Sequence, residues 1–149
     1  PAGALMAGRP VLLIGSGGLF AGLSVWGSPW QPWFKDWAFN LPRGPQLAQH
    51  WASAPADLDL LITHTPPAGV LDRTWRGEPV GCADLSAALP RLRPRLHVFG
   101  HIHEARGQAR LDSGGLALNA SNLNLMYRVA HPPWVIDWEP DGPRVLSGG

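Results

Sequence analysis

Three histidines stand where two apolar runs of the chain end. His64 directly follows LDLLIT (58–63), and His101 and His103 follow LHVF (96–99) after one glycine. Neutral imidazole is a preferred ligand for zinc, manganese and iron. Two histidines separated by one residue point the same way in an extended chain, so both can face one ion. The spacing favours a metal site, although such histidines also occur as hydrogen-bonded structural residues.

The two apolar runs are bounded by turn residues, which is typical of buried strands. In layered α/β folds ligands gather at the carboxyl ends of such strands, so the histidines lie where a site is expected. A hairpin is predicted from 11–14, a turn at 16–18 and a return strand over 19–26. The other predicted elements are helices over 45–53 and 83–92 and short strands over 109–112, 116–120 and 134–138. This order favours an α/β layered fold, β-rich with short helices, in one unit over 1–149.

Composition excludes several classes of protein. The 149 residues include 18 Gly and 16 Pro, yet 45% are hydrophobic and the net charge is +1, so a disordered chain is excluded. Glycine has no three-residue period, which excludes collagen. With 12 basic and 11 acidic residues, no nucleic-acid polymer or anionic membrane is expected as a partner. Cys82 is the only cysteine, so no internal disulfide is expected.

An uncharged stretch over 10–34 invites a test for a membrane span. Five glycines and two prolines interrupt it before it reaches the roughly 20 apolar residues that a span requires. We therefore disfavour a transmembrane or signal segment. With no targeting segment recognised, a cytoplasmic location is expected.

Other candidate residues favour structural roles. His97 lies within an apolar run and is expected in the core, and His50 and His131 are expected to be structural or solvated. The tryptophan-rich loop over 28–44 could stack with bases, or pack within the core and loops, and packing is the favoured interpretation.

Six segments of the chain resemble the calcineurin-like metallophosphoesterases, and the resemblance as a whole covers about residues 11–138. The segments are WGSPWQPWFKDWAFN (26–40), ITHTPPAGVLD (62–72), VGCADL (80–85), RPRLHVFGHIHEARG (93–107), NASNLNLMYR (119–128) and PPWVIDW (132–138). The motif Gly-His-x-His is only moderately specific, whereas the ordered set of segments is highly specific.

The resemblance implies a hydrolase with two divalent metal ions (manganese, iron or zinc) and a metal-activated hydroxide that attacks phosphorus. It implies that His64 and His101 bind the second metal and that His103 binds the first. Asn119 and Asn122 would line the substrate side, or form turns, which is the safer interpretation. The implied substrate is a small phosphoester or a nucleotide, and the implied fold is the C-terminal part of a layered αββα sandwich.

The family's N-terminal metal motifs, with the bridging carboxylate and the general acid, do not occur in this sequence. Asp72 is interpreted as fixing its loop through hydrogen bonds. The chain is therefore expected to be a fragment, the C-terminal half of a phosphodiesterase-like domain, and weak or inactive when isolated. The alternative is a non-catalytic remnant or a metal-binding or interaction module. An uncovered sheet edge or apolar face would favour self-association.

Overall fold

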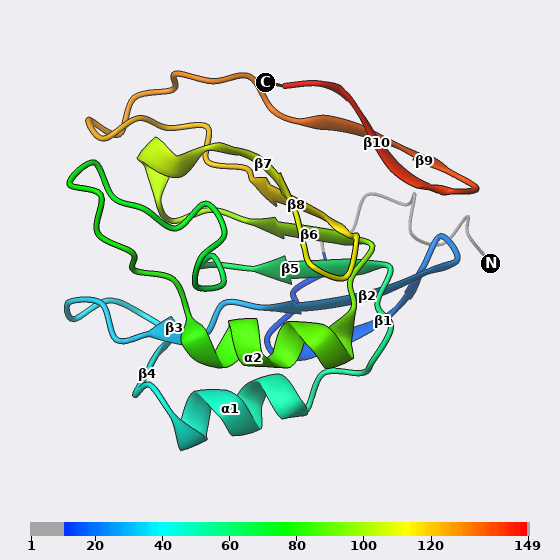
Figure 1. Cartoon of the computed structure of the whole chain (residues 1–149), viewed down its shortest axis with the longest axis horizontal. Coiled ribbons are helices and arrows are strands. Elements are labelled where there is room, and N and C mark those ends of the chain that lie inside the picture. Colours follow the sequence, from blue (N-terminus) through cyan, green and yellow to red (C-terminus); the bar gives the residue numbers. More distant parts are fainter. Residues whose placement is uncertain (1–10, 149) are drawn as a thin grey trace.

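The computed structural model describes residues 11–148. In this part of the chain a six-stranded sheet has the order β1-β2-β5-β6-β8-β7 (Figure 1). Strands β2, β5, β6 and β8 are parallel, and the two edge strands β1 and β7 are antiparallel to their neighbours. The strands of this sheet are β1 (Ser16–Phe20), β2 (Leu23–Ser28), β5 (Leu60–Thr63), β6 (Leu96–Phe99), β7 (Gly107–Arg110) and β8 (Leu116–Asn119). The predicted α/β class is confirmed.

Two helices, α1 (Pro45–Ala52) and α2 (Ala83–Leu92), cover one face of the sheet. Helix α1 starts with proline, whose missing N–H costs nothing in a first turn, and it buries Leu47 and Trp51 on one face. The Cys82 thiol accepts a hydrogen bond from the Leu85 amide at the start of α2. Both helices were predicted, and α2 continues two residues beyond Pro90.

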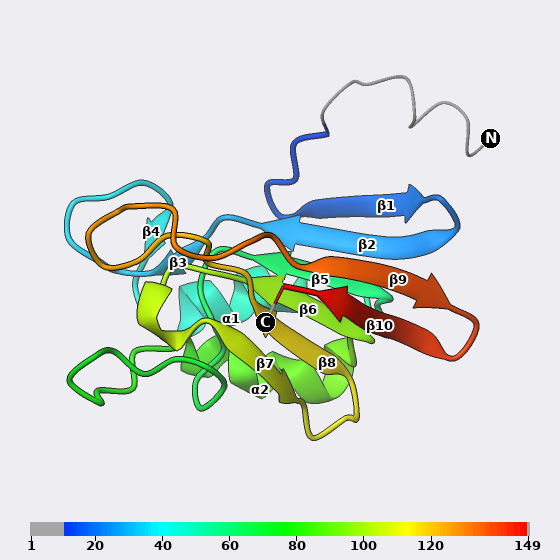
Figure 2. The ribbon, with the colours of Figure 1, turned by 90° about the horizontal axis from the view of Figure 1, so that it is seen from above.

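The opposite face of the sheet packs against a separate hairpin of β9 (Val135–Glu139) and β10 (Gly142–Ser147) (Figure 2). Alternate residues of the parallel strands explain the two faces, since successive strand side chains point to opposite sides. Leu61 packs against the helices, whereas Leu96 and Leu118 pack with Trp134 and Ile136 at the hairpin. The remaining strands are β3 (Gln31–Pro32) and β4 (Asn40–Leu41), which pair with each other.

The first hairpin differs from the prediction. Its turn lies at Ala21 and Gly22, and the Ser-Gly-Gly sequence predicted as the turn belongs to β1. Both turn residues have positive φ, 51° and 85°, which is the backbone that a tight two-residue hairpin turn requires. The prediction was wrong because an Ala-Gly pair is a weaker turn signal than two consecutive glycines.

No helix in residues 11–148 is long and apolar enough to cross a membrane.

Candidate metal centre

The parallel register of β5 and β6 brings His64 and His101 together. Each histidine follows the carboxyl end of its strand, and the Gly100 amide donates a 3.1 Å hydrogen bond to the His64 carbonyl. His64 Nε2 lies 3.1 Å from His101 Nδ1, and the ring centroids are 4.8 Å apart. His101 has φ of 69°, a backbone that non-glycine residues seldom adopt and that concentrates at functional sites.

His103 lies in a short 3₁₀ helix (His103–Ala105) after the same turn, and its Nδ1 is 3.0 Å from the Asn124 carbonyl oxygen. A carbonyl can only accept, so Nδ1 carries the hydrogen and a neutral His103 keeps a lone pair on Nε2. Metal-binding histidines typically have this arrangement, with one nitrogen fixed by a carbonyl and the other free to ligate. His103 and His101 line the same pocket.

Both members of the histidine pair are held in the neutral form. Burial, and then the neighbouring His64 and His103, lower the pKa of His101 to about 4, although Glu104 opposes this. Burial also lowers the pKa of His64. Because metal binding requires neutral imidazole, these side chains are ready to ligate at neutral pH.

The spacing of the pair fits a shared ion. Two nitrogens that bind one zinc ion tetrahedrally at about 2.0–2.1 Å lie about 3.3 Å apart, close to the observed 3.1 Å. Within residues 11–148, no group of three or more His, Cys, Asp or Glu side chains is arranged to hold a metal ion. The structure therefore brings together His64 and His101, and metal ligation by these two histidines and by His103 stays a prediction.

Aromatic side chains of the loop between β3 and β4 stand against the histidine pair. The Phe34 and Trp37 rings meet His101 edge to face, with centroids 4.9 and 6.3 Å away. The Asn40 side chain holds this loop, accepting from the Phe34 amide and donating to the Phe34, Lys35 and Trp37 carbonyls. These contacts were missed by sequence reasoning, and the only signal was the density of aromatic residues over 28–44.

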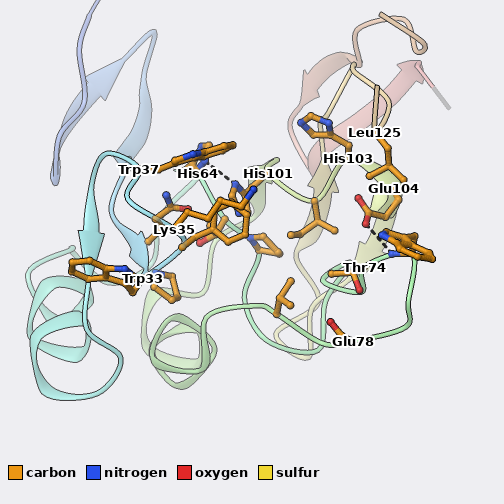
Figure 3. A pocket seen from close by; sticks show the side chains of 18 of the residues that line it. Trp33, Lys35, Trp37, His64, Thr74, Glu78, His101, His103, Glu104 and Leu125 are labelled. Carbon is orange, nitrogen blue, oxygen red and sulfur yellow. Dashed lines mark hydrogen bonds between the residues drawn. The ribbon is translucent and has the colours of Figure 1, made fainter. Parts of the chain in front are cut away.

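The histidine pair opens into a cavity of about 830 Å³. In Figure 3, Trp33, Lys35 and Trp37 lie on one side of His64 and His101. Thr74, Glu78, Glu104 and Leu125 lie on the other side. The cavity therefore extends well beyond the metal-ligating atoms, across loops from three parts of the chain.

The two candidate asparagines have different surroundings in the structure. Asn119 is fully buried, and its side chain donates to the Ile102 carbonyl at 2.8 Å and accepts from the Ser121 amide at 3.1 Å. It thus holds the turn between the two histidines of Gly-His-x-His. Asn122 is exposed and borders a smaller cavity of about 340 Å³ that also touches His101. Substrate contact by either asparagine stays a prediction.

The remaining candidates have structural surroundings. Asp72 is buried and accepts hydrogen bonds from the Gly69 and Gly81 amides at 2.9 and 3.2 Å, which confirms its loop-fixing role. His97 is fully buried, as predicted. His50 packs among tryptophans and lies 2.6 Å from the Ser28 hydroxyl.

The tryptophans divide into two groups. Trp26 and Trp51, which lie outside the loop over 28–44, pack in the core. In contrast, Trp33 is 65%, Trp37 46% and Trp75 67% exposed. The Trp37 ring packs within its loop on the Phe34 ring, with centroids 5.1 Å apart, as the packing interpretation holds. That interpretation was wrong for Trp33, because backbone hydrogen bonds hold its position and leave the ring exposed at the cavity.

Comparison with known proteins gives sequence relatives for most of the chain. Metallophosphoesterase domain-containing protein 1 of Homo sapiens is 48% identical over 120 residues, which cover 78% of this chain and 36% of that protein. A UPF0046 protein of Caenorhabditis elegans is 51% identical over 87 residues, 58% of this chain and 22% of that protein. The chain thus spans about a third of the length of the human relative. No family model matches it.

A solved structure that covers 73% of this chain and 45% of its own chain superposes with a TM-score of 0.53 at 19% identity. This likeness concerns the fold alone, and it supports the α/β architecture.

Proposed function

Since the chain belongs to the calcineurin-like metallophosphoesterase family, we propose that it supplies His64, His101 and His103 as metal ligands of a phosphoester hydrolase. The observation that carries the proposal is the pair of neutral imidazoles, whose facing nitrogens lie 3.1 Å apart at the edge of a large cavity. A small phosphoester or nucleotide is the substrate class that the family implies.

When bound, a divalent cation (manganese, iron or zinc) supplies a Lewis acid that polarises a phosphoryl oxygen. The chain's own groups support this chemistry. The strand-end hydrogen bond from Gly100 to the His64 carbonyl fixes the separation of the histidine pair. The Phe34 and Trp37 rings exclude water from one side of His101, which strengthens electrostatic attraction there.

Three cations, Lys35, Arg43 and Arg76, line the cavity together with two carboxylates, Glu78 and Glu104, so the lining has an excess of positive charge. Two of the cations lie beside aromatic rings. Lys35 Nζ lies 5.3 Å from the centroid of the Phe34 ring, and the Arg76 guanidinium lies 4.8 Å from that of Trp75. Both charges therefore stand at the walls of the cavity that the histidine pair borders, where they attract an anionic substrate.

The test measures metal binding and hydrolysis separately. Calorimetric titration with Zn²⁺ and Mn²⁺ is compared between the chain and His101→Ala, and hydrolysis of bis(p-nitrophenyl) phosphate is followed in parallel. We expect metal binding that His101→Ala weakens, and slow turnover, in keeping with a fragment of the domain, that the same variant abolishes. Metal binding without turnover would support the alternative, a non-catalytic metal-binding module. Binding and turnover that are unchanged in His101→Ala would contradict the proposal.

A further inference from the structure

A tight hairpin turn carries the carbonyl that His103 contacts. The Asn124 amide donates a 2.9 Å hydrogen bond to the Arg128 carbonyl, and the Tyr127 amide donates a 2.9 Å hydrogen bond to the Asn124 carbonyl. Three residues, 125–127, therefore connect the two sides of the turn. A hairpin loop of this length takes its third residue in the left-handed region, where glycine is favoured.

The third position of this turn is occupied by a tyrosine. Tyr127 has a φ of 56°, a backbone that is strained for a bulky residue and that concentrates at functional sites. Burial of the ring does not explain the choice of residue, because Tyr127 is 65% exposed. The ring instead meets the His103 ring edge to face, with the centroids 5.3 Å apart. The strained position therefore brings an aromatic ring against a candidate metal ligand.

The Asn124 side chain shapes the same turn. Its Oδ1 accepts hydrogen bonds from the Met126 amide at 2.9 Å and from the Arg128 amide at 3.2 Å. The Asn124 carbonyl has two lone pairs, so it can accept from the Tyr127 amide and also from His103 Nδ1. The side chain of Asn124 thus fixes the turn, and its carbonyl contacts the histidine.

Arg106 fixes the base of the loop that carries this turn. Its guanidinium donates to the Ser121 carbonyl at 2.9 Å and to the Pro132 carbonyl at 2.7 Å. Both ends of the loop are therefore held beside the segment that contains His103. The Asn124 carbonyl reaches His103 from a loop that is fixed at its base and at its tip.

We propose that Asn124 is a positioning residue for His103. By shaping the turn it holds the carbonyl that keeps a hydrogen on Nδ1 and leaves the Nε2 lone pair for a metal ion. The nitrogen that a histidine offers to a metal is set by the hydrogen bond that the other nitrogen makes. The inference rests on the proposed function for the ligation step only, since the tautomer of His103 can be measured without metal.

The first measurement is the tautomer of His103 in the metal-free full chain. Long-range proton–nitrogen NMR spectra at pH 8 distinguish a ring nitrogen that carries a hydrogen from one that does not, and His103→Ala assigns the signals. We expect the Nδ1–H form to predominate. Asn124→Ala removes the acceptor of two turn amides and gives a mixture of the two tautomers. Asn124→Asp keeps that acceptor and restores the Nδ1–H form.

Two variants of the same turn are matched controls. Met126→Ala removes a side chain that is 74% exposed and keeps the amide that bonds to Asn124, so the tautomer is unchanged. Tyr127→Gly removes the ring and suits the left-handed backbone of the turn, so it also keeps the Nδ1–H form. Loss of that form in Tyr127→Gly, with retention in Asn124→Ala, would assign the role to the ring and overturn the proposal.

The second measurement is Zn²⁺ binding at His103 itself, followed through the Nε2 signal. We expect Asn124→Ala to raise the Zn²⁺ concentration at half-saturation by about 10-fold, which is typical when the hydrogen-bond partner of a ligand is altered. Asn124→Asp should not raise it. Urea denaturation checks that each variant remains folded.

The outcomes separate this inference from the proposed function. A His103 tautomer and a Zn²⁺ affinity that are unchanged in Asn124→Ala would overturn the positioning role and leave the proposed function standing. A change of tautomer without any loss of Zn²⁺ affinity would also overturn it. A His103 Nε2 signal that Zn²⁺ does not move in the parent chain, together with a tautomer that depends on Asn124, would overturn metal ligation by His103 and leave Asn124 as the residue that orients the ring.

Discussion

Strands β5 and β6 carry two histidine sites only a few residues apart, and the two sites have opposite properties. Thr63 and His97 form a buried pair inside the sheet, whereas His64 and His101 form a pair just beyond the strand ends. Both pairs bridge the same two strands. The difference between them is access: one imidazole is sealed in the core and the other two face a cavity.

The buried pair has a defined protonation. The Thr63 hydroxyl donates to the Thr65 carbonyl at 2.8 Å, so its oxygen accepts from His97 Nε2 at 2.9 Å. His97 therefore carries a hydrogen on Nε2. Burial lowers the pKa of His97 to about 3, so the ring is neutral at pH 7. The edge pair is also neutral, yet its nitrogens share only a contact with each other that a metal ion can replace. A histidine thus serves structure or ligation according to which partners its nitrogens already have.

The largest change in stability is expected when the buried histidine is replaced. His97→Ala leaves a cavity and an unpaired Thr63 hydroxyl oxygen, and we expect it to lower the free energy of unfolding by about 3 kcal/mol. Zinc affinity of the folded chain should change less than about 3-fold. Urea denaturation gives the first quantity and calorimetry the second. A loss of zinc affinity as large as that caused by His101→Ala would contradict the assignment of His97 to a structural role and of His101 to metal binding.

The converse change is His101→Ala. Loss of a direct ligand should weaken zinc binding by more than about 100-fold. Mutating a residue that only hydrogen-bonds a ligand typically weakens metal binding by about 10- to 100-fold. The free energy of unfolding of the metal-free chain should fall by less than about 1 kcal/mol, since the ring is partly exposed. His131→Ala is the matched control, because His131 lies outside the cavity of the histidine pair. Equal zinc affinity in the two variants would contradict the assignment.

Acidification should lower the free energy of unfolding through the buried His97. The folded-state pKa of His97 is about 3, below its ordinary value of about 6.5. Its contribution to stability is therefore complete above pH 6.5 and is lost as the pH falls toward 3, because the unfolded chain takes up a proton first. We expect a loss of about 2 kcal/mol from this group by pH 5.

The measurement is urea denaturation between pH 7.5 and pH 5, repeated with His97→Gln. The lowered pKa values of His64 and His101 act in the same direction, so only the difference between the two proteins isolates His97. The variant should show a flatter dependence on pH. Parallel curves for the two proteins would show that His97 does not titrate differently on folding.

Sequence reasoning found the parts of both pairs that depend on local pattern. The run LHVF predicted β6 at its observed bounds and placed His97 in the core. The strand-end positions predicted that His64 and His101 lie at one edge of the sheet. That the two share one metal ion was implied only by resemblance, because direct contact depends on the register between strands that are far apart in the chain. The packing of Phe34 and Trp37 against His101 could not be predicted. The Asn40 side chain arranges these two residues through hydrogen bonds to their backbone, and such bonds leave no pattern in the sequence.

The smallest expected effect tests a residue that joins the two regions. Asn119 is buried beside β6, and its amide holds the Ile102 carbonyl between His101 and His103. Asn119→Ala leaves that carbonyl and the Ser121 amide without their partner, so we expect a loss of about 1–2 kcal/mol in the free energy of unfolding. A displaced turn should also weaken zinc binding several-fold.

The exposed Asn122 supplies the control, since Asn122→Ala removes a side chain that the core does not use. If Asn119 contacts substrate directly, its replacement would raise the KM for a phosphodiester and leave stability and zinc affinity unchanged. If it positions the turn, stability and zinc affinity fall together while the KM changes little. The buried geometry favours the second outcome, because the Asn119 side chain is fully buried and both of its polar atoms bond to the backbone of the fold.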